Sequence, residues 1–184
     1  LKLDVGVNRN TAQWLALRVS TTGTLSPISV SSVTLYLDNG NGTFGAEDTL
    51  VSYATNTFNA AGNVDLRLAS PQTLNTATQS YFVVLNVIST AAIGGTVGVT
   101  LHSPGAVTLA SPDTVTSTNF PQSSGNATVA DGPDTVTVTP TSQAPASADQ
   151  NTSFSVLRLA MLTDQENAQL SALQVTKSGN LADS

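Results

Sequence analysis

The sequence LKLDVGVNRNTAQWLALRVSTTGTLSP, residues 1–27, governs the interpretation of the whole chain, because a related sequence returns near the other end. Residues 157–183, LRLAMLTDQENAQLSALQVTKSGNLAD, align with it without a gap, so that Leu157 stands opposite Leu1 at an offset of 156 residues. Nine of the 27 aligned pairs are identical, and the apolar positions keep their phase. We interpret the two stretches as copies of one repeated unit.

The first copy indicates the secondary structure of both. Its apolar residues alternate with polar ones, and a period of two is typical of strands with one buried face: Leu1, Leu3, Val5 and Val7, then Leu15, Leu17 and Val19. The second copy is rich in Leu, Ala, Gln and Glu, which favours a helix over 155–173. Because its apolar phase follows the first copy, we predict strands at 157–162 and 168–176, joined near 164–167, with a helix as the alternative.

The middle of the chain consists of further apolar runs separated by Gly, Pro, Asn and Asp. The apolar phase shifts between Val30 and Val33, which predicts a bulge. The run SYFVVLNVI, residues 80–88, is apolar on both faces and predicts a central buried strand. Short, closely spaced strands without helices predict an all-β antiparallel sandwich. The polar stretch 121–134 is the expected linker.

The repeat predicts how the chain is divided. Residues 1–130 form one sandwich unit, and residues 131–184 form a linker with the first strands of a second, incomplete unit. Strands expected at 134–139 and 152–161 open that second unit. The start of the sequence has no counterpart of the first of these strands, so we expect the first unit to lack its leading strand.

Composition excludes several classes of function. The net charge is -6 and the six basic residues are scattered, which argues against nucleic-acid binding. The absence of cysteine excludes disulfides and thiolate metal sites, and no apolar run is long enough to predict membrane insertion. His102 is the only histidine and is expected at an exposed strand end. No motif indicates a catalytic group, so we predict that the protein is not an enzyme.

One polar loop is a candidate site. In LYLDNGNGTFGAEDTLV, residues 35–51, an apolar strand runs into Asp, Asn and Gly residues, and an acidic pair follows. Calcium prefers carboxylate and amide oxygens at alternating positions with a Gly at the sharp turn. The candidate calcium ligands are Asp38, Asn39, Asn41, Glu47 and Asp48. The alternative is that Asn-Gly pairs only supply positive φ for a hairpin turn.

Three segments, 157–184, 30–51 and 79–101, together resemble a known group of proteins. They are similar to the tandem immunoglobulin-like β-sandwich repeats of secreted and cell-surface proteins of bacteria and archaea. The shared pattern is a strand ending in Leu-Tyr-x-Asp, a loop rich in Asn, Asp and Gly, and a later aromatic-Val-Val strand. The resemblance implies an immunoglobulin-like fold, an extracellular or cell-surface location, a role in a fibre, sheath or surface layer, and in some members calcium.

Two classes of function follow. The first is a non-catalytic structural subunit of an extracellular filament, sheath or surface array, which joins copies of itself head to tail by strand complementation or tandem repeats. The alternative is a carbohydrate-binding or spacer module of a secreted multidomain enzyme or adhesin. Four aromatic residues could stack on sugars, although core roles are favoured for the first and last: Trp14, Tyr36, Tyr53 and Tyr81. Surface glycans are a further expected partner, and three asparagines begin glycosylation sequons: Asn41, Asn126 and Asn151.

Overall fold

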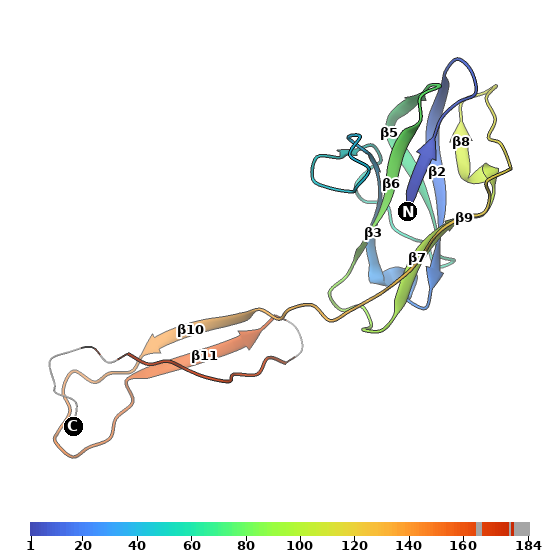
Figure 1. The fold of residues 1–184 in the computed structure, drawn as a ribbon. Coiled ribbons are helices and arrows are strands. Elements are labelled where there is room, and N and C mark those ends of the chain that lie inside the picture. The colour runs from blue at the N-terminus through green and yellow to red at the C-terminus, as the bar shows by residue number, and fades with distance from the viewer. Residues whose placement is uncertain (165–166, 177, 179–184) are drawn as a thin grey trace. The chain divides into compact units, whose positions relative to one another are not determined.

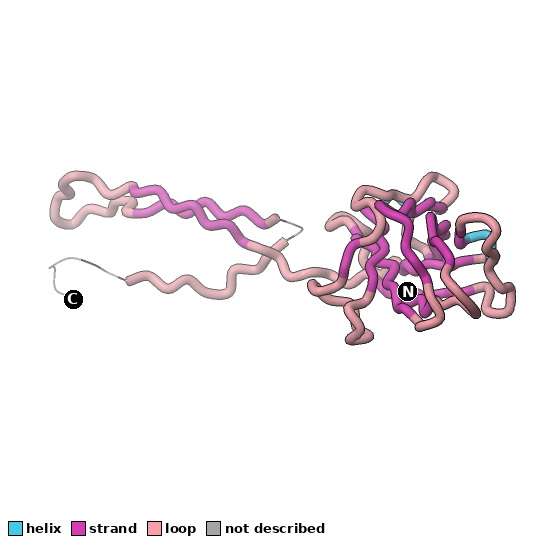
Figure 2. Tube along the Cα trace, turned by 90° about the horizontal axis from the view of Figure 1, so that it is seen from above, coloured by secondary structure: helices cyan, strands magenta, loops and turns pink. Residues whose placement is uncertain are grey.

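The protein is all-β. The computed structural model describes residues 1–164, 167–176 and 178, and the chain forms two compact units, Leu1–Asp131 and Gly132–Ser184. Strands build both units (Figure 1), and the helical residues in the described part of the chain belong to two 3-10 turns, Pro27–Ser29 and Pro104–Ala106 (Figure 2). The prediction of an all-β protein is confirmed.

One sheet of the first unit has four antiparallel strands. Their order is β1 (Lys2–Val5), β6 (Gln79–Val87), β3 (Val30–Leu37) and β4 (Thr49–Leu50). Within β6, Tyr81, Phe82 and Val83 are buried in succession, so both faces of this inner strand are covered. The central buried strand is confirmed, and so is the predicted bulge, because the β3–β6 register shifts between Val30 and Ser32.

The second sheet is organised around one long strand. Its order is β5 (Asn63–Leu74), β2 (Ala12–Gly23), β7 (Thr96–Leu101) and β9 (Gln122–Thr128), and β8 (Val107–Leu109) also pairs with β2. One edge of β2 pairs with β5, while the other edge pairs first with β8 and then with β7. This strand, the counterpart of 168–176 in the repeat, is therefore held on both sides.

The two sheets share one hydrophobic core, as expected of a sandwich. Alternation along β2 directs Leu17 and Val19 into the same buried cluster as Leu35 of β3. Trp14 of β2 meets Tyr81 of β6 edge to face, with ring centroids 4.9 Å apart. Burial of an aliphatic or Phe side chain stabilises a fold by about 1.5–3 kcal/mol, so this layer between the sheets is the main source of stability.

The linker predicted at 121–134 is wrong over most of its length. Residues 122–128 form β9, an edge strand that pairs with β7, and irregular chain follows from 129 to 135. Side-chain composition indicates a loop because almost every residue of β9 is exposed. Backbone hydrogen bonds to β7, which composition does not report, make this segment a strand.

The second unit contains one antiparallel hairpin, β10 (Val136–Ser142) with β11 (Leu157–Thr163), paired from Val136 opposite Thr163 to Ser142 opposite Leu157. The strand predicted at 157–162 is confirmed. The strand predicted at 134–139 begins two residues later, at Val136. The strand predicted at 152–161 begins only at Leu157.

The strand predicted at 168–176 is wrong. Described residues 167–176 carry neither strand nor helix. In the first unit the equivalent strand β2 pairs with β5, β7 and β8, and residues 132–184 contain no counterpart of those partners. The turn predicted at 164–167 includes residues 165 and 166, which lie outside the described residues.

Candidate functional site

The candidate loop runs from Asp38, at the end of β3, to Asp48, just before β4. Asp38 Oδ1 accepts hydrogen bonds from the N–H groups of Gly40 at 2.9 Å and Gly42 at 3.2 Å, and its Oδ2 accepts from Gly42 at 3.1 Å. Both glycines have positive φ, 100° and 78°, which L side chains rarely adopt. The Asp-Asn-Gly-Asn-Gly sequence therefore builds a tight turn around one carboxylate.

The Asp48 carboxylate joins two parts of this loop by hydrogen bonds. Its side chain is buried, and Oδ1 accepts from the Asn39 N–H at 3.0 Å while Oδ2 accepts from the Gly45 N–H at 2.9 Å. A buried carboxylate needs such donors, because its desolvation is otherwise unfavourable. Asp48 is thus a structural acceptor, a role that the acidic pair in the sequence did not reveal.

The other candidate ligands also bond within the loop or face solvent. Asn39 Oδ1 accepts from the Asn41 N–H at 3.0 Å, Asn41 Oδ1 accepts from the Thr43 N–H at 2.8 Å, and Glu47 is exposed. Among the described residues, no group of three or more acidic, His or Cys side chains is placed to hold a metal ion. The loop oxygens serve N–H donors in this arrangement, and calcium binding stays a prediction of the sequence.

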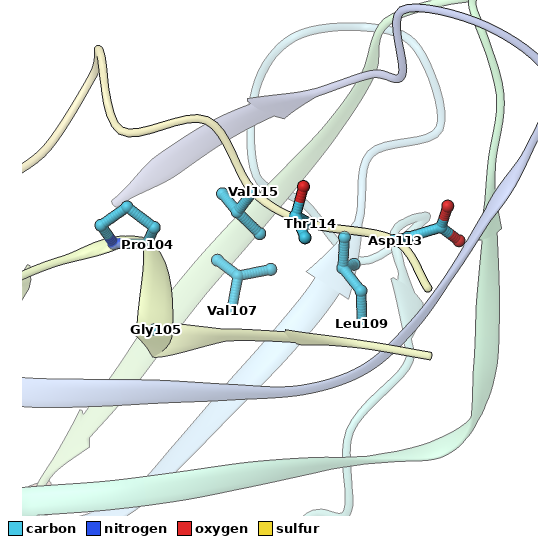
Figure 3. A pocket seen from close by; sticks show the side chains of 7 residues that line it. All are labelled: Pro104, Gly105, Val107, Leu109, Asp113, Thr114 and Val115. Atoms are coloured by element: carbon cyan, nitrogen blue, oxygen red, sulfur yellow. The ribbon is translucent and has the colours of Figure 1, made fainter. Parts of the chain in front are cut away.

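Two shallow hollows flank strands of the first unit. One, of about 470 Å³, lies between the loop and the β1–β6 pair, where Lys2, Asp38 and Ser80 give it a polar lining. The other, of about 230 Å³, lies where the segment after β8 passes over that strand: Val115 and Thr114 face Val107 and Leu109 (Figure 3).

The four candidate sugar-stacking aromatics do not form one platform. Trp14 and Tyr81 are buried in the core, which confirms the structural role favoured for them. The indole N–H of Trp14 donates to the Ala16 carbonyl at 2.8 Å, and burial raises the pKa of the Tyr81 hydroxyl. Tyr53 is exposed and Tyr36 is half-buried.

Sequence reasoning missed a different aromatic group. Phe44, which follows the Asn-Gly turns of the loop, is 49% exposed. Its ring centroid lies 5.1 Å from that of Tyr36 and 6.0 Å from that of Phe82, both edge to face. Alternation along β3 and β6 could have placed Tyr36 and Phe82 on one face of the sheet, but nothing in the sequence directs the loop residue onto them.

His102 is exposed just beyond β7, as predicted. An exposed pair on the second sheet joins Arg18 of β2 to Asp65 of β5, with Nε 2.6 Å from Oδ1 and Nη2 2.8 Å from Oδ2. The hydrogen bond from Arg18 lowers the pKa of the Asp65 carboxyl. This bidentate pair lies directly across the two strands and serves to hold their register.

The second unit leaves its apolar residues on the surface. Val136 and Val138 of β10 are 43% and 48% exposed, and Leu157 and Met161 of β11 are similarly open. In an antiparallel pair directly opposite residues share a face, and Val138 is opposite Met161. These side chains therefore form one apolar face of the hairpin, defined here as Val136, Val138, Leu157, Leu159 and Met161.

No helix in residues 1–164 and 167–176 has the length and apolar character needed to cross a membrane. No family model, no curated protein and no solved structure matches the chain.

Proposed function

We propose that this chain is a non-catalytic structural module, built from immunoglobulin-like repeats, of an extracellular filament, sheath or surface array, and that it assembles with copies of itself. The observation that carries the proposal is the different burial of equivalent apolar positions in the two units. Leu1, Leu3 and Val5 pack against the core of the first unit. Their counterparts Leu157, Leu159 and Met161 lie on the apolar face of the hairpin.

An apolar hairpin face of this kind favours association. A two-stranded hairpin is marginally stable alone, and it gains stability by packing on a further layer. Repeats whose units cannot bury their own apolar surface depend on their neighbours for it. The low charge of the chain and its Thr, Ser and Asn content suit a surface that is covered by other copies or by glycans. The three sequon asparagines are all exposed.

Sedimentation velocity of the full chain over a wide range of concentrations tests the proposal. We expect the mean mass to rise with concentration above that of the 18.8 kDa monomer. Val138→Asn, on the apolar face, should keep the chain monomeric, whereas Thr139→Asn, on the opposite face of β10, should not. A wild-type chain that stays monomeric at every concentration would overturn the proposal.

Carbohydrate binding is the second candidate, because the exposed Phe44 ring is held by edge-to-face contacts with the rings of Tyr36 and Phe82. Aromatic faces of this kind can contact the apolar faces of sugars. Retarded migration of the chain in polysaccharide-containing gels, abolished by Phe44→Ala and retained in Tyr53→Ala, would favour this candidate. Equal migration of all three proteins would remove it.

A further inference from the structure

The outer edge of β1 carries a defined set of backbone groups. Leu1 exchanges two hydrogen bonds with Val83 of β6: the Leu1 amino group donates to the Val83 carbonyl at 3.1 Å, and the Val83 N–H donates to the Leu1 carbonyl at 2.8 Å. Bonded and non-bonded pairs alternate along an antiparallel ladder. Leu3 and Val5 therefore bond to β6 as well, while the N–H and C=O groups of Lys2, Asp4 and Gly6 point away from it.

In the hairpin, the backbone hydrogen bonds between β10 and β11 fall on the alternate residues. The Gln143 N–H donates to the Val156 carbonyl at 3.0 Å, and the Asp164 N–H donates to the Thr135 carbonyl at 3.1 Å. By the same alternation, the residues of β11 that bond to β10 are Arg158, Ala160 and Leu162. At the repeat offset of 156 residues, these three are the counterparts of Lys2, Asp4 and Gly6. The edge of β11 that holds β10 is thus the edge that β1 presents outward.

Side chains agree with this correspondence. If each β11 residue is replaced by the residue 156 positions earlier, the β10–β11 register places Val138 opposite Val5 and Val136 opposite Val7. This pairing joins apolar residues on the core face. On the other face it places Thr139 opposite Asp4 and Thr141 opposite Lys2, which joins polar residues. A slip of one residue would turn the valines of β10 to the solvent face.

We propose that the outer edge of β1 binds β10 of a second copy of this chain, antiparallel, with Val138 opposite Val5 and Thr139 opposite Asp4. The inference rests on the proposed function and names the surface and the register of the contact. Among the described residues, β1 and β4 are the two end strands of the four-stranded sheet, and β4 has only 2 residues, so the outer edge of β1 is the longer edge on which a further strand would fit. Pro140, which has no N–H to donate, lies at the position of β10 that points away from β11, so β10 pairs along one edge only.

The exchange also has a driving force. While β10 is paired with β11, the β10 side chains Val136 and Val138 stay about half exposed. On β1 they would extend a sheet whose apolar residues pack on a sandwich core. Burial of more apolar surface favours the second position. Because donor and acceptor lie in different units of one chain, the contact is heterologous and builds rows of copies unless its rotation closes a ring.

Disulfide trapping tests the register, and because the chain has no cysteine of its own, the introduced cysteines are the only ones that can form a disulfide. Val5→Cys and Val138→Cys are placed in two differently tagged chains, mixed and mildly oxidised. The two positions form a non-hydrogen-bonded pair, in which Cβ atoms are about 4.5 Å apart, close to disulfide geometry. We expect a mixed dimer at least ~10-fold more abundant than with Asp4→Cys and Val138→Cys, since Asp4 points to the other face. Should Val5→Cys fail to fold, Val7→Cys with Val136→Cys samples the same register.

A second measurement tests the exchange itself. Ser142→Cys with Leu157→Cys in one chain lies across another non-hydrogen-bonded pair, keeps Pro140 in place and fixes β10 to its own β11. The oxidised chain should stay monomeric in sedimentation, and reduction should restore association. If the chain associates but the Val5–Val138 pair traps no better than the Asp4 control, or if the oxidised chain associates as before, this inference is overturned while the proposed function stands. If the wild-type chain never associates, both fail.

Discussion

Aligned residues of the two similar stretches, 1–27 and 157–183, have opposite environments. Leu17 and Val19 of β2 have no exposed surface, whereas their counterparts Leu173 and Val175 are 57% and 76% exposed. The local sequences share Ala-Leu-x-Val, so local propensity does not account for the difference. What differs is the set of partner strands, since β2 lies between β5 on one edge and β7 and β8 on the other. Tertiary contacts, and not the sequence of the segment, make this pattern a strand.

The largest expected effect comes from truncating the same leucine in both copies. Leu17→Ala should lower the free energy of unfolding by about 2–5 kcal/mol, because it leaves a cavity in a closed core. Leu173→Ala should change it by less than about 0.5 kcal/mol, as for an exposed side chain. Urea unfolding followed by far-UV circular dichroism, which reports the strands of both units, measures both, and the fluorescence of Trp14, the single tryptophan, reports the first unit separately. Equal losses would mean that the second copy is packed like the first.

The loop of the first unit gives the next effect, since residues 132–184 contain no such loop. Asp48→Ala leaves two loop N–H groups without their acceptor and should destabilise the first unit by about 1–3 kcal/mol. Glu47→Ala, the exposed neighbour, is the matched control and should lie within about 0.5 kcal/mol of wild type. The loss should be the same in calcium and in chelator. A loss confined to calcium buffer would instead assign the carboxylate to an ion.

Tyr81 lies on β6, the partner strand of β1, and no strand equivalent to β6 lies beside β11 among the described residues. A pH dependence of stability that comes from Tyr81 therefore belongs to the first unit. Its hydroxyl is buried without a hydrogen-bond partner among the described residues, and burial raises its pKa. The folded state therefore keeps its proton at a pH where the unfolded state loses it, so stability should fall as pH rises above the ordinary tyrosine pKa of about 10. Tyr81→Phe should flatten this fall and leave neutral-pH stability equal or higher by about 1 kcal/mol. An unchanged alkaline slope in thermal unfolding would refute this explanation.

The smallest expected effect concerns Arg18 and Asp65, a pair that the second copy does not repeat because Gln174 replaces the arginine. The pKa of Asp65 is lowered chiefly by its hydrogen bond from Arg18. The contribution of the pair is thus present above the ordinary carboxyl pKa and is lost as pH falls through the Asp65 value. Arg18→Gln should return that pKa to the ordinary range in an NMR titration. An unmoved value would assign the shift to Arg67 instead.

Much of the first unit could be predicted from the sequence. Period two along 1–19 and two-sided apolarity along 80–88 predict strands because burial in a sandwich imposes those periods. The repeat also predicted a strand at 157–162 against a helical composition. The prediction failed at 122–128, where exposed Ser and Asn form a strand through backbone bonds alone, and at 168–176, where the right pattern has no partners.

The candidate site could be predicted in its turn chemistry but not in its contacts. Asp-Asn-Gly-Asn-Gly predicts a tight turn because Gly supplies positive φ. Which donors reach Asp48, and that Phe44 lies over Tyr36, depend on how the loop folds back onto β3. Such long-range placement has no periodic signal in a single sequence.

Pro140 has a consequence for how the protein behaves when concentrated. Exposed strand edges are templates for sideways fusion into cross-β aggregates, and a missing amide proton interrupts the ladder that such fusion requires. With proline on the open side of β10, the proposed rows of copies would lengthen without fusing to one another along that side. A solution of the chain should therefore age into thin, separable threads without acquiring amyloid-dye fluorescence.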